Sequence, residues 1–250
     1  MTHIRLENVN VEIPIYDSHA LRLIRLPSLL RAKVGTSTVS HSGNVILMHA
    51  LRDLNLDLFE GDRVCIIGHN GAGKSTLLRL IAGIYPPTSG TAEISGEVFA
   101  LLGSNLTLNM DATGYENIQL VAHIRQWPRE SLLDYIRDIE EFTELGEYLS
   151  LPARVYSAGM QARLAYALAT IQSPDILLID EGIGAGDADF QLKAQQRTQR
   201  FVGGAKILLL ASHSRDLCKA LCSKALLLAK GENVFFGDIQ EAFMRYSKLR

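Results

Sequence analysis

The sequence has little of what marks membrane-spanning, disulfide-rich or nucleic-acid-binding proteins. It contains no apolar run that approaches the roughly 20 residues needed to cross a membrane. Its 250 residues include three cysteines, and 25 Lys and Arg nearly balance 27 Asp and Glu, for a formal net charge of −2. The net charge therefore gives no overall basic field that would attract nucleic acid. Any membrane-spanning part of the system is expected to be another polypeptide. Repeats and low-complexity tracts are absent.

The three cysteines predict a chain without disulfides. Cys65 lies in an apolar run and is expected in the core, whereas Cys218 and Cys222 are four residues apart on a predicted helix. A metal site would need further ligands close by, so we interpret these two as packing residues. Free thiols and the lack of a signal peptide indicate a reducing cytosol.

The most informative segment is the nine-residue sequence Gly-His-Asn-Gly-Ala-Gly-Lys-Ser-Thr. It lies between an apolar run over 64–67 and a segment over 77–82 whose apolar residues have helical spacing. This is the strand, glycine loop and helix of a phosphate-binding loop. Backbone N–H groups can point at an anion, and the helix N-terminus adds partial positive charge. Lys74 can reach the outer phosphates, and the Ser75 hydroxyl can hold magnesium. The predicted nucleoside triphosphate site comprises Gly68, His69, Asn70, Gly71, Ala72, Gly73, Lys74, Ser75 and Thr76.

The wider pattern predicts an α/β fold, a P-loop NTPase (RecA-like) core with a mostly parallel sheet and an antiparallel β part on the N-terminal side. Apolar and polar residues alternate over 4–13, as in an edge strand. The segment 45–59 is expected to form a second strand pair. Two short strands are expected about Gly96, within 91–102. After residue 172 strands and helices alternate, which implies parallel strands joined by crossover helices.

The helical periodicity over 111–172 predicts an inserted helical subdomain. The chain, 1–250, is then a single domain whose α/β core is built from 1–110 and 173–250. Residues 17–44 break the strand pattern and are expected to form an insertion.

Two carboxylates follow the predicted strand over 176–179. They could simply mark a strand edge, but downstream of a phosphate loop they indicate hydrolysis. Asp180 would orient magnesium, commonly through water, and Glu181 would polarise the attacking water as general base. His213 follows the strand over 207–210, and is either a core or capping histidine or a hydrogen-bond partner of the γ-phosphate and the water.

A second anion site is predicted in Tyr-Ser-Ala-Gly-Met, 156–160. An ordinary helix capped by Ser157 is the simpler interpretation. However, the Ser157 hydroxyl and the Gly159 N–H at a helix N-terminus also form an anion site. Because one nucleotide cannot easily need both sites from one subunit, we expect this helix end to contact the nucleotide of a second copy. That predicts a head-to-tail homodimer with two nucleotides at its interface.

The ordered set of phosphate loop, Ser-x-Gly helix, Asp-Glu strand and Ser-His resembles the ATPase subunit of ABC transporters, over essentially the whole chain. The variant at 156–160 and the motifs at 113–117 and 186–190 resemble the subfamily that exports lipid-linked polysaccharides: O-antigen, capsule or teichoic acid. The resemblance implies ATP and Mg²⁺ as cofactors and two copies of an integral membrane permease as partner, with no nucleic acid. It implies a peripheral position on the cytoplasmic face of the bacterial inner membrane, and places Asp187 in the loop that senses the opposing subunit.

The sequence departs from this family in two places. ABC ATPases usually carry a glutamine after the strand that here ends near Leu102, where it contacts magnesium and the membrane partner. Here Gly-Ser-Asn follows, so Ser104 or Asn105 is a candidate substitute. The adenine-stacking aromatic is missing in its plain form, and His49 and Tyr16 are candidates, with His49 favoured.

The insertion over 17–44 is rich in arginine and leucine, and no acidic residue occurs from 18 to 52. It is either a helix laid on its own domain or a basic amphipathic element near anionic headgroups or a pyrophosphate-linked lipid. In the resembling exporters an insertion at this place lies by the membrane–cytosol boundary.

Other function classes fit the sequence less well. A soluble ABC-type ATPase acting on DNA or the ribosome usually needs a long coiled coil, two ATPase modules or a basic face, and none is apparent. A P-loop kinase would not need the residues at 157–159, and the Asn-Lys-x-Asp guanine reader of a GTPase is absent. The sequence therefore predicts the ATP-hydrolysing subunit of a polysaccharide exporter, with an ABC ATPase for another substrate as a further alternative.

Overall fold

A computed structural model describes residues 1–15, 38–42, 45–102, 108–180 and 188–248. The chain divides into two compact units. The first, which we call the α/β unit, comprises Met1–Gly103, Asp175–Gly182 and Lys206–Arg250. The second, the helical unit, comprises Ser104–Pro174 and Ile183–Ala205. Several predictions lie outside the described residues: those on Tyr16, Ser104, Asn105, Glu181, Asp187 and, apart from 38–42, the insertion over 17–44.

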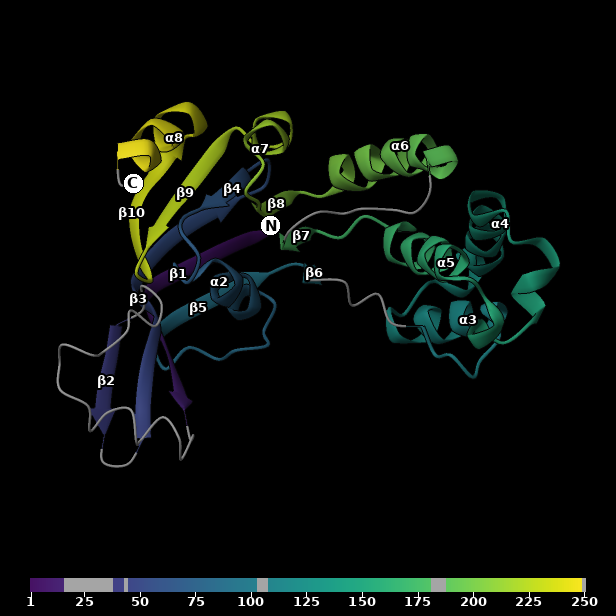
Figure 1. Ribbon diagram of the computed structural model, residues 1–250, viewed down its shortest axis with the longest axis horizontal. Helices are drawn as coiled ribbons and strands as arrows, with labels where there is room; N and C mark the ends of the chain where they lie inside the picture. Colours follow the sequence, from purple (N-terminus) through teal and green to yellow (C-terminus); the bar gives the residue numbers. More distant parts are fainter. Residues whose placement is uncertain (16–37, 43–44, 103–107, 181–187, 249–250) are drawn as a thin grey trace. The chain divides into compact units, whose positions relative to one another are not determined.

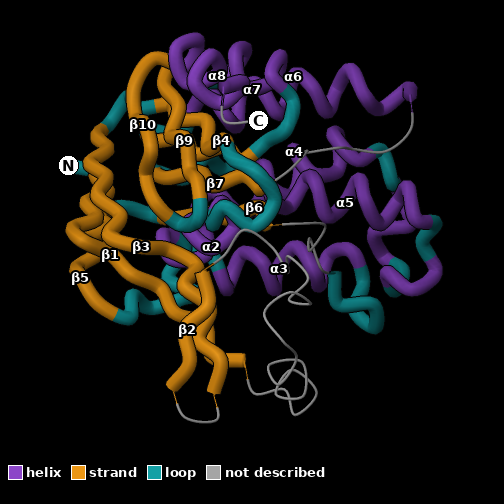
Figure 2. Tube along the Cα trace, turned by 60° about the vertical axis from the view of Figure 1, so that its left-hand side comes forward, coloured by secondary structure: helices purple, strands orange, loops and turns teal. Residues whose placement is uncertain are grey.

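An antiparallel sheet forms the N-terminal part of the α/β unit, in the strand order β2-β3-β1-β5 (Figures 1 and 2). The predicted edge position of the first strand is wrong, because β1 lies between β3 and β5. The predicted strand pair over 45–59 is also wrong, since one 15-residue strand occupies it. The bounds are β1 (His3–Ile15), β2 (Thr38–Ser42), β3 (Val45–Phe59) and β5 (Ser89–Ser95).

The second sheet of this unit has six strands, in the order β10-β9-β4-β8-β7-β6. All neighbours pair in parallel except β10 with β9, which confirms the predicted mostly parallel sheet. The two short strands predicted about Gly96 are present, but they belong to different sheets. The bounds are β4 (Arg63–Ile67), β6 (Val98–Leu102), β7 (Ile176–Asp180), β8 (Ile207–Ala211), β9 (Lys224–Ala229) and β10 (Glu232–Asp238).

Helix α2 (Lys74–Ile81) completes the core of the α/β unit. Its buried leucines and isoleucine share one hydrophobic cluster with side chains of β1, β3, β4, β7 and β8. The central strands are buried on both faces, which explains why they read as continuous apolar runs rather than as alternating ones. Two further helices follow in the chain, α7 (Arg215–Leu221) and α8 (Ile239–Lys248), and α8 packs against β9 and β10.

The cysteines depart from the prediction of three free thiols. Cys65 on β4 and Cys218 on α7 are joined in a disulfide, with their Cα atoms 5.8 Å apart. The two are 153 residues apart in sequence and meet only because β8, which precedes α7, pairs with β4. Cys222 is free and buried, and burial raises the pKa of its thiol to about 12.

The helical unit has its own apolar core, which includes Ile118, Ile139 and Leu164. Arg197 on α6 donates to the Thr170 hydroxyl at 2.7 Å, so α6 packs with this unit. The prediction that residues 173–250 all belong to the α/β core is therefore wrong for α6. The helices are α3 (Gly114–Ile124), α4 (Leu132–Thr143), α5 (Ala158–Thr170) and α6 (Ala188–Gly204), with short 3-10 turns η2 (Arg129–Ser131), η3 (Gly146–Ser150) and η4 (Ala153–Val155).

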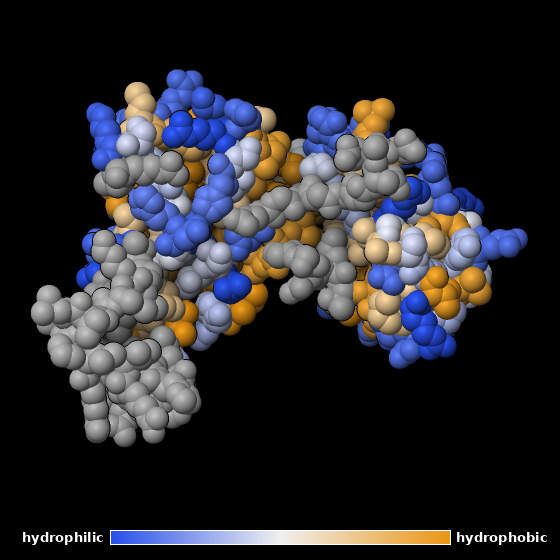
Figure 3. Space-filling view, in the orientation of Figure 1, coloured by the Kyte–Doolittle hydropathy of each residue, from blue (hydrophilic) through white to orange (hydrophobic). Residues whose placement is uncertain are grey.

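Apolar side chains also remain exposed on the helical unit. Leu120 and Ile124 on α3 and Leu133 on α4 are among them. Figure 3 shows hydrophobic patches among hydrophilic residues on this unit. Within the described residues, no helix is both long and apolar enough to span a bilayer.

Candidate nucleotide-binding site

Parallel pairing brings the predicted site residues of the α/β unit to one edge of the six-stranded sheet. The phosphate loop follows β4, His213 follows β8, and Asp180 ends β7. Ile66, Ala211 and Asp180 are in register across these three adjacent strands. At about 4.8 Å per strand, the end of β7 is roughly 10 Å from the end of β4. The carboxyl edge of a parallel sheet is where such folds bind ligands.

The phosphate loop needs glycine at two positions for steric reasons. A Cβ on Gly68 would lie 2.4 Å from the Leu228 carbonyl oxygen, and one on Gly73 would lie 2.7 Å from that of Ala50. Gly73 also has a φ of +106°, which L side chains rarely adopt. The loop is therefore held against β3 and β9 in a shape that other residues could not take.

Lys74 is the first residue of α2, and its side chain folds back over the loop. Its Nζ donates to the carbonyl oxygens of Gly68, at 2.9 Å, and His69, at 3.1 Å. Gly73, which precedes the helix, offers no side chain to cap the first-turn N–H groups. A positive ammonium and helix N–H groups thus converge on the inside of the loop, an arrangement suited to phosphate oxygens.

The oxygen ligands predicted for magnesium fit an ion that arrives with a nucleotide. Ser75 lies in the first turn of α2, and Asp180 is partly exposed at the end of β7. Hydroxyl and carboxylate oxygens suit Mg²⁺, which usually keeps several waters and binds phosphate oxygens. The described residues contain no group of three His, Cys, Asp or Glu that could hold a metal ion by themselves.

The structure narrows the alternatives for His213. The residue is exposed, so it is not a core histidine. Ser214, the next residue, is the N-cap of α7, because its Oγ accepts the Leu217 N–H at 3.3 Å. His213 is therefore not the capping residue of this helix. The role toward the γ-phosphate remains as a prediction.

His49, the candidate for adenine stacking, lies on β3. Its Nδ1 is 3.2 Å from the Glu12 Oε1 on the paired strand β1. The stacking role stays a prediction.

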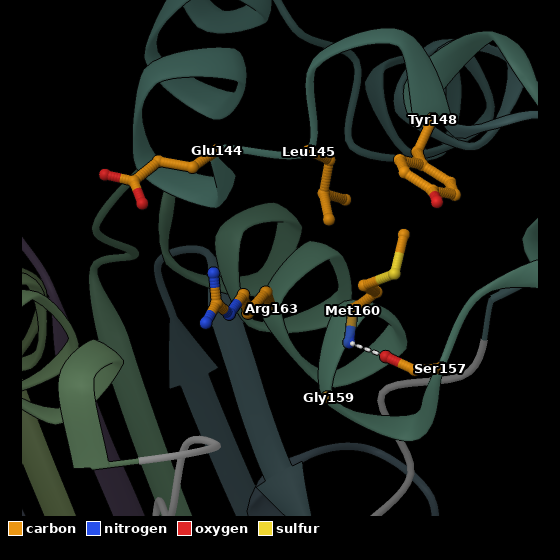
Figure 4. Close-up of a pocket in the computed structure, with 7 residues that line it drawn as sticks. All are labelled: Glu144, Leu145, Tyr148, Ser157, Gly159, Met160 and Arg163. Atoms are coloured by element: carbon orange, nitrogen blue, oxygen red, sulfur yellow. Dashed lines mark hydrogen bonds between the residues drawn. The ribbon is translucent and has the colours of Figure 1, made fainter.

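The predicted second anion site lies in the helical unit, at the start of α5. Ser157 is the N-cap, and its Oγ accepts the Met160 N–H at 3.3 Å, so the predicted capping is confirmed (Figure 4). Ser157 and Gly159 line a pocket of about 230 Å³ together with Arg163 and the acidic residue Glu144. The Arg163 guanidinium lies over the Phe190 ring, 4.8 Å from its centroid. Sequence reasoning missed Arg163, although it lies less than two helical turns beyond Ser157.

The motif over 113–117 supports the loop that precedes this helix end. Thr113 and Glu116 form a reciprocal capping box at the start of α3. Asn117 is buried, and its side chain bonds the backbone of Asn109, Ala112 and Thr113.

The segment that Asn117 holds is in turn bonded to residues just before Ser157. The N–H groups of Ala153 and Arg154 donate to the carbonyl oxygens of Ala112 and Met110, both at 2.9 Å. The Tyr156 hydroxyl donates to the Tyr148 carbonyl oxygen at 2.7 Å, and burial raises the pKa of Tyr156. The motif over 113–117, which in the sequence marks only a subfamily resemblance, caps α3 and holds the loop before it through Asn117.

Comparison with known proteins matches residues 51–184 to the family described as ABC transporter. The chain is 42% identical over 231 residues to the O-antigen export system ATP-binding protein RfbE of Yersinia enterocolitica. The aligned residues cover 92% of this chain and 96% of that protein. It is 35% identical over 198 residues to the teichoic acids export ATP-binding protein TagH of Shouchella clausii (strain KSM-K16), across 79% of this chain and 55% of that relative.

Solved structures share the fold. A dimeric post-hydrolysis state of the ATP-binding cassette MJ0796 bound to ADP and Pi matches with a TM-score of 0.63 and 21% identity, over 94% of this chain and 98% of that one. An ATP-binding subunit of an ABC transporter matches with a TM-score of 0.68 and 18% identity, over 98% and 100%. These matches confirm the predicted α/β P-loop fold.

Proposed function

Because this chain belongs to the ABC transporter family, we propose that it is the ATP-binding and ATP-hydrolysing subunit of an exporter of lipid-linked polysaccharide. The observation that carries the substrate class is the 42% identity, over nearly the full length of both chains, to an O-antigen export ATP-binding protein. A relative named for teichoic acid export favours the same class, because both substrates are cell-surface glycopolymers. These relatives also favour export over a role on DNA or the ribosome.

In this proposal the α/β unit binds the triphosphate. The backbone of the loop over 68–76 cradles the phosphates, and Lys74 exchanges its two carbonyl partners for phosphate oxygens. Ser75 and Asp180 would hold Mg²⁺, which would neutralise phosphate charge when bound. Glu181 accepts a proton from the attacking water, and His213 hydrogen-bonds the γ-phosphate.

The helical unit completes the site of a second copy of the chain. The pocket at the start of α5 presents the Ser157 hydroxyl and the Gly159 N–H, which suit a phosphate oxygen. Its lining also holds the Arg163 guanidinium and the Glu144 carboxylate. A solved cassette of the same fold is dimeric in its ADP and Pi state, which supports a homodimer here. Asp187 would take part in the contact between the two copies.

The homodimer would act with two copies of an integral membrane permease, as a peripheral protein on the cytoplasmic face of the inner membrane. The exposed apolar residues Leu120, Ile124 and Leu133 of the helical unit offer a surface for that permease. The basic residues within 17–44 would lie near anionic headgroups.

The proposal is tested by deleting the gene and restoring it as wild type, as Lys74→Ala or as Lys219→Ala. Lys74→Ala removes the charge that binds the outer phosphates, whereas Lys219 is an exposed lysine on α7 and serves as the matched control. We expect surface glycan to return with the wild type and with Lys219→Ala, and to stay absent with Lys74→Ala while lipid-linked glycan accumulates inside the cell. Surface glycan restored by Lys74→Ala would contradict the proposal.

A further inference from the structure

The C-terminal part of the α/β unit supports the phosphate loop from its outer side. Gly68 lies so close to the Leu228 carbonyl oxygen of β9 that no Cβ would fit between them. The Gly231 N–H, in the turn between β9 and β10, donates to the Ala72 carbonyl oxygen at 3.0 Å. Both contacts reach the backbone of the loop.

A third contact comes from helix α8 and reaches a side chain of the loop. The ring of Tyr246 packs on the imidazole of His69, with 5.2 Å between the ring centroids and a tilt of 52°. Both residues are partly buried. This geometry is within the range of favourable aromatic pairs.

The position of Tyr246 is set by the packing of α8 rather than by the loop. Phe243 on the same helix is buried, with the Arg215 guanidinium 5.3 Å from its ring centroid. Arg245 lies 4.2 Å from the ring centroid of Phe235 on β10 and pairs with Glu241 at 2.6 Å. Figure 1 shows α8 beside β9 and β10. The Tyr246 ring is therefore a fixed surface against which the loop can rest.

His69 is the residue through which this surface can act on the phosphate site. Its carbonyl oxygen accepts the Lys74 ammonium at 3.1 Å and the Ala72 N–H at 3.1 Å. A shift of the His69 backbone would move both the lysine and the loop N–H groups. On the basis of the proposed phosphate site, we propose that Tyr246 is a positioning residue, which holds the loop in its anion-binding shape through His69.

The test measures ATP hydrolysis and ligand affinity with the full chain. Loss of the ring pair in Tyr246→Ala is expected to raise the KM for ATP roughly 2- to 10-fold and to change kcat less than KM, because the loop binds phosphate before the chemical step. The affinities for ATP and for inorganic tripolyphosphate should fall by the same factor. Met244→Ala is the matched control, since Met244 is an exposed residue on the same helix.

If Tyr246→Ala lowers the affinity for ATP but not for tripolyphosphate, the proposal is overturned, because Tyr246 would then contact the nucleoside. Unchanged KM and affinity in Tyr246→Ala would overturn it as well. Tyr246→Phe keeps the ring and is expected to behave as wild type, whereas Tyr246→Leu keeps apolar volume only and should behave as Tyr246→Ala. If Tyr246→Ala does not fold, the comparison of Tyr246→Phe with Tyr246→Leu tests the proposal instead.

Coupling between the two rings provides a second measurement. His69→Ala should also weaken binding, and adding Tyr246→Ala should weaken it no further, whereas independent effects would multiply and contradict the proposal. Lys74→Ala in the same assay separates this inference from the proposed function. If Lys74→Ala binds tripolyphosphate normally, the phosphate site itself is wrong; if only Lys74→Ala loses binding, Tyr246 alone is assigned wrongly.

Discussion

Single buried side chains hold the loop that precedes the Ser157 end of α5. Asn117 is 2% exposed, and its amide both donates to and accepts from backbone groups of the loop before α3. An amide has two donors and two acceptor sites, so one residue can bind a loop at several points. Tyr156 adds a hydroxyl that donates to a backbone carbonyl and lies close to Gly114. Local order near Ser157 therefore depends on a few side chains.

Gly114→Ala should destabilise the helical unit. The added Cβ would lie 2.6 Å from the Tyr156 Oη and 2.7 Å from the Leu149 Cδ2, so the neighbours must move apart. We expect the free energy of unfolding in urea to fall by about 1–3 kcal/mol, the usual cost of overpacking. Gly203→Ala on α6 is the control: its Cβ meets nothing within 4 Å, and helix propensity should raise the free energy by about 0.5–1 kcal/mol. Equal changes in both variants would show that the Tyr156 contact is unimportant.

Glu181→Gln should slow hydrolysis strongly while leaving ATP binding intact. Glutamine keeps the size of the side chain but cannot accept a proton from the attacking water. A general base contributes about 10²–10⁴ to the rate, so turnover should fall by that factor and ATP should remain bound. Phosphate release and equilibrium ATP binding are the measurements, with Glu130→Gln on the exposed turn η2 as control. A normal rate in Glu181→Gln would remove Glu181 from the mechanism.

At the scale of elements, the start of α3 links helix stability to pH. The hydrogen bond from the Thr113 N–H lowers the pKa of the Glu116 carboxyl in the folded chain. Because the folded pKa is depressed, this contribution to stability is present above the unfolded pKa and is lost as the pH falls through the folded pKa. The capping box should therefore weaken on acidification.

Glu116→Gln should reduce this acid sensitivity. Glutamine can still accept a hydrogen bond from the Thr113 N–H, but it does not titrate. From about pH 5 to pH 3, the thermal unfolding midpoint of the wild type should fall more than that of Glu116→Gln. Other acidic groups titrate in the same window in both proteins, so the difference between the two curves is the measurement. Parallel curves would contradict a titrating cap.

Elements were predictable where one short segment carries the whole signal. The apolar runs over 176–179 and 207–210 form β7 and β8, and Ser157 caps α5, because burial on both faces and N-cap chemistry are local patterns. The position of β1 in its sheet was not predictable, since β5 pairs with it from beyond the phosphate loop. Alternation of apolar and polar residues indicates a half-buried strand, but it is the same for a strand at the edge of a sheet and for one in the middle.

At the scale of the whole molecule, the proposed homodimer can be tested by mixing variants. The structure leaves space for a side chain at Gly159, where an added Cβ meets only the Ser157 Oγ, at 3.9 Å. Gly159→Asp should therefore fold normally, yet place a carboxylate against the phosphates of the second copy. We expect an unchanged unfolding midpoint, loss of ATP hydrolysis and loss of the ATP-bound dimer in sedimentation.

Mixing Gly159→Asp with Lys74→Ala distinguishes a shared site from a self-contained one. In a head-to-tail dimer the first variant supplies an intact phosphate loop and the second an intact Ser157 end, so one working site is rebuilt and part of the hydrolysis returns. The double variant mixed with either single variant is the control and should stay inactive. No recovery in the first mixture would mean that the Ser157 end does not serve the second copy.

From the sequence alone, the buried strands β7 and β8 and the α5 cap could be predicted, because each depends on hydrogen bonding and periodicity within a few neighbouring residues. Only the tertiary structure decided which side chains meet across the fold: Cys218 with Cys65, Tyr246 with His69, and Arg163 with the Ser157 pocket. Such contacts depend on strand order and on the packing of helices that are distant in sequence, and no local pattern carries that information.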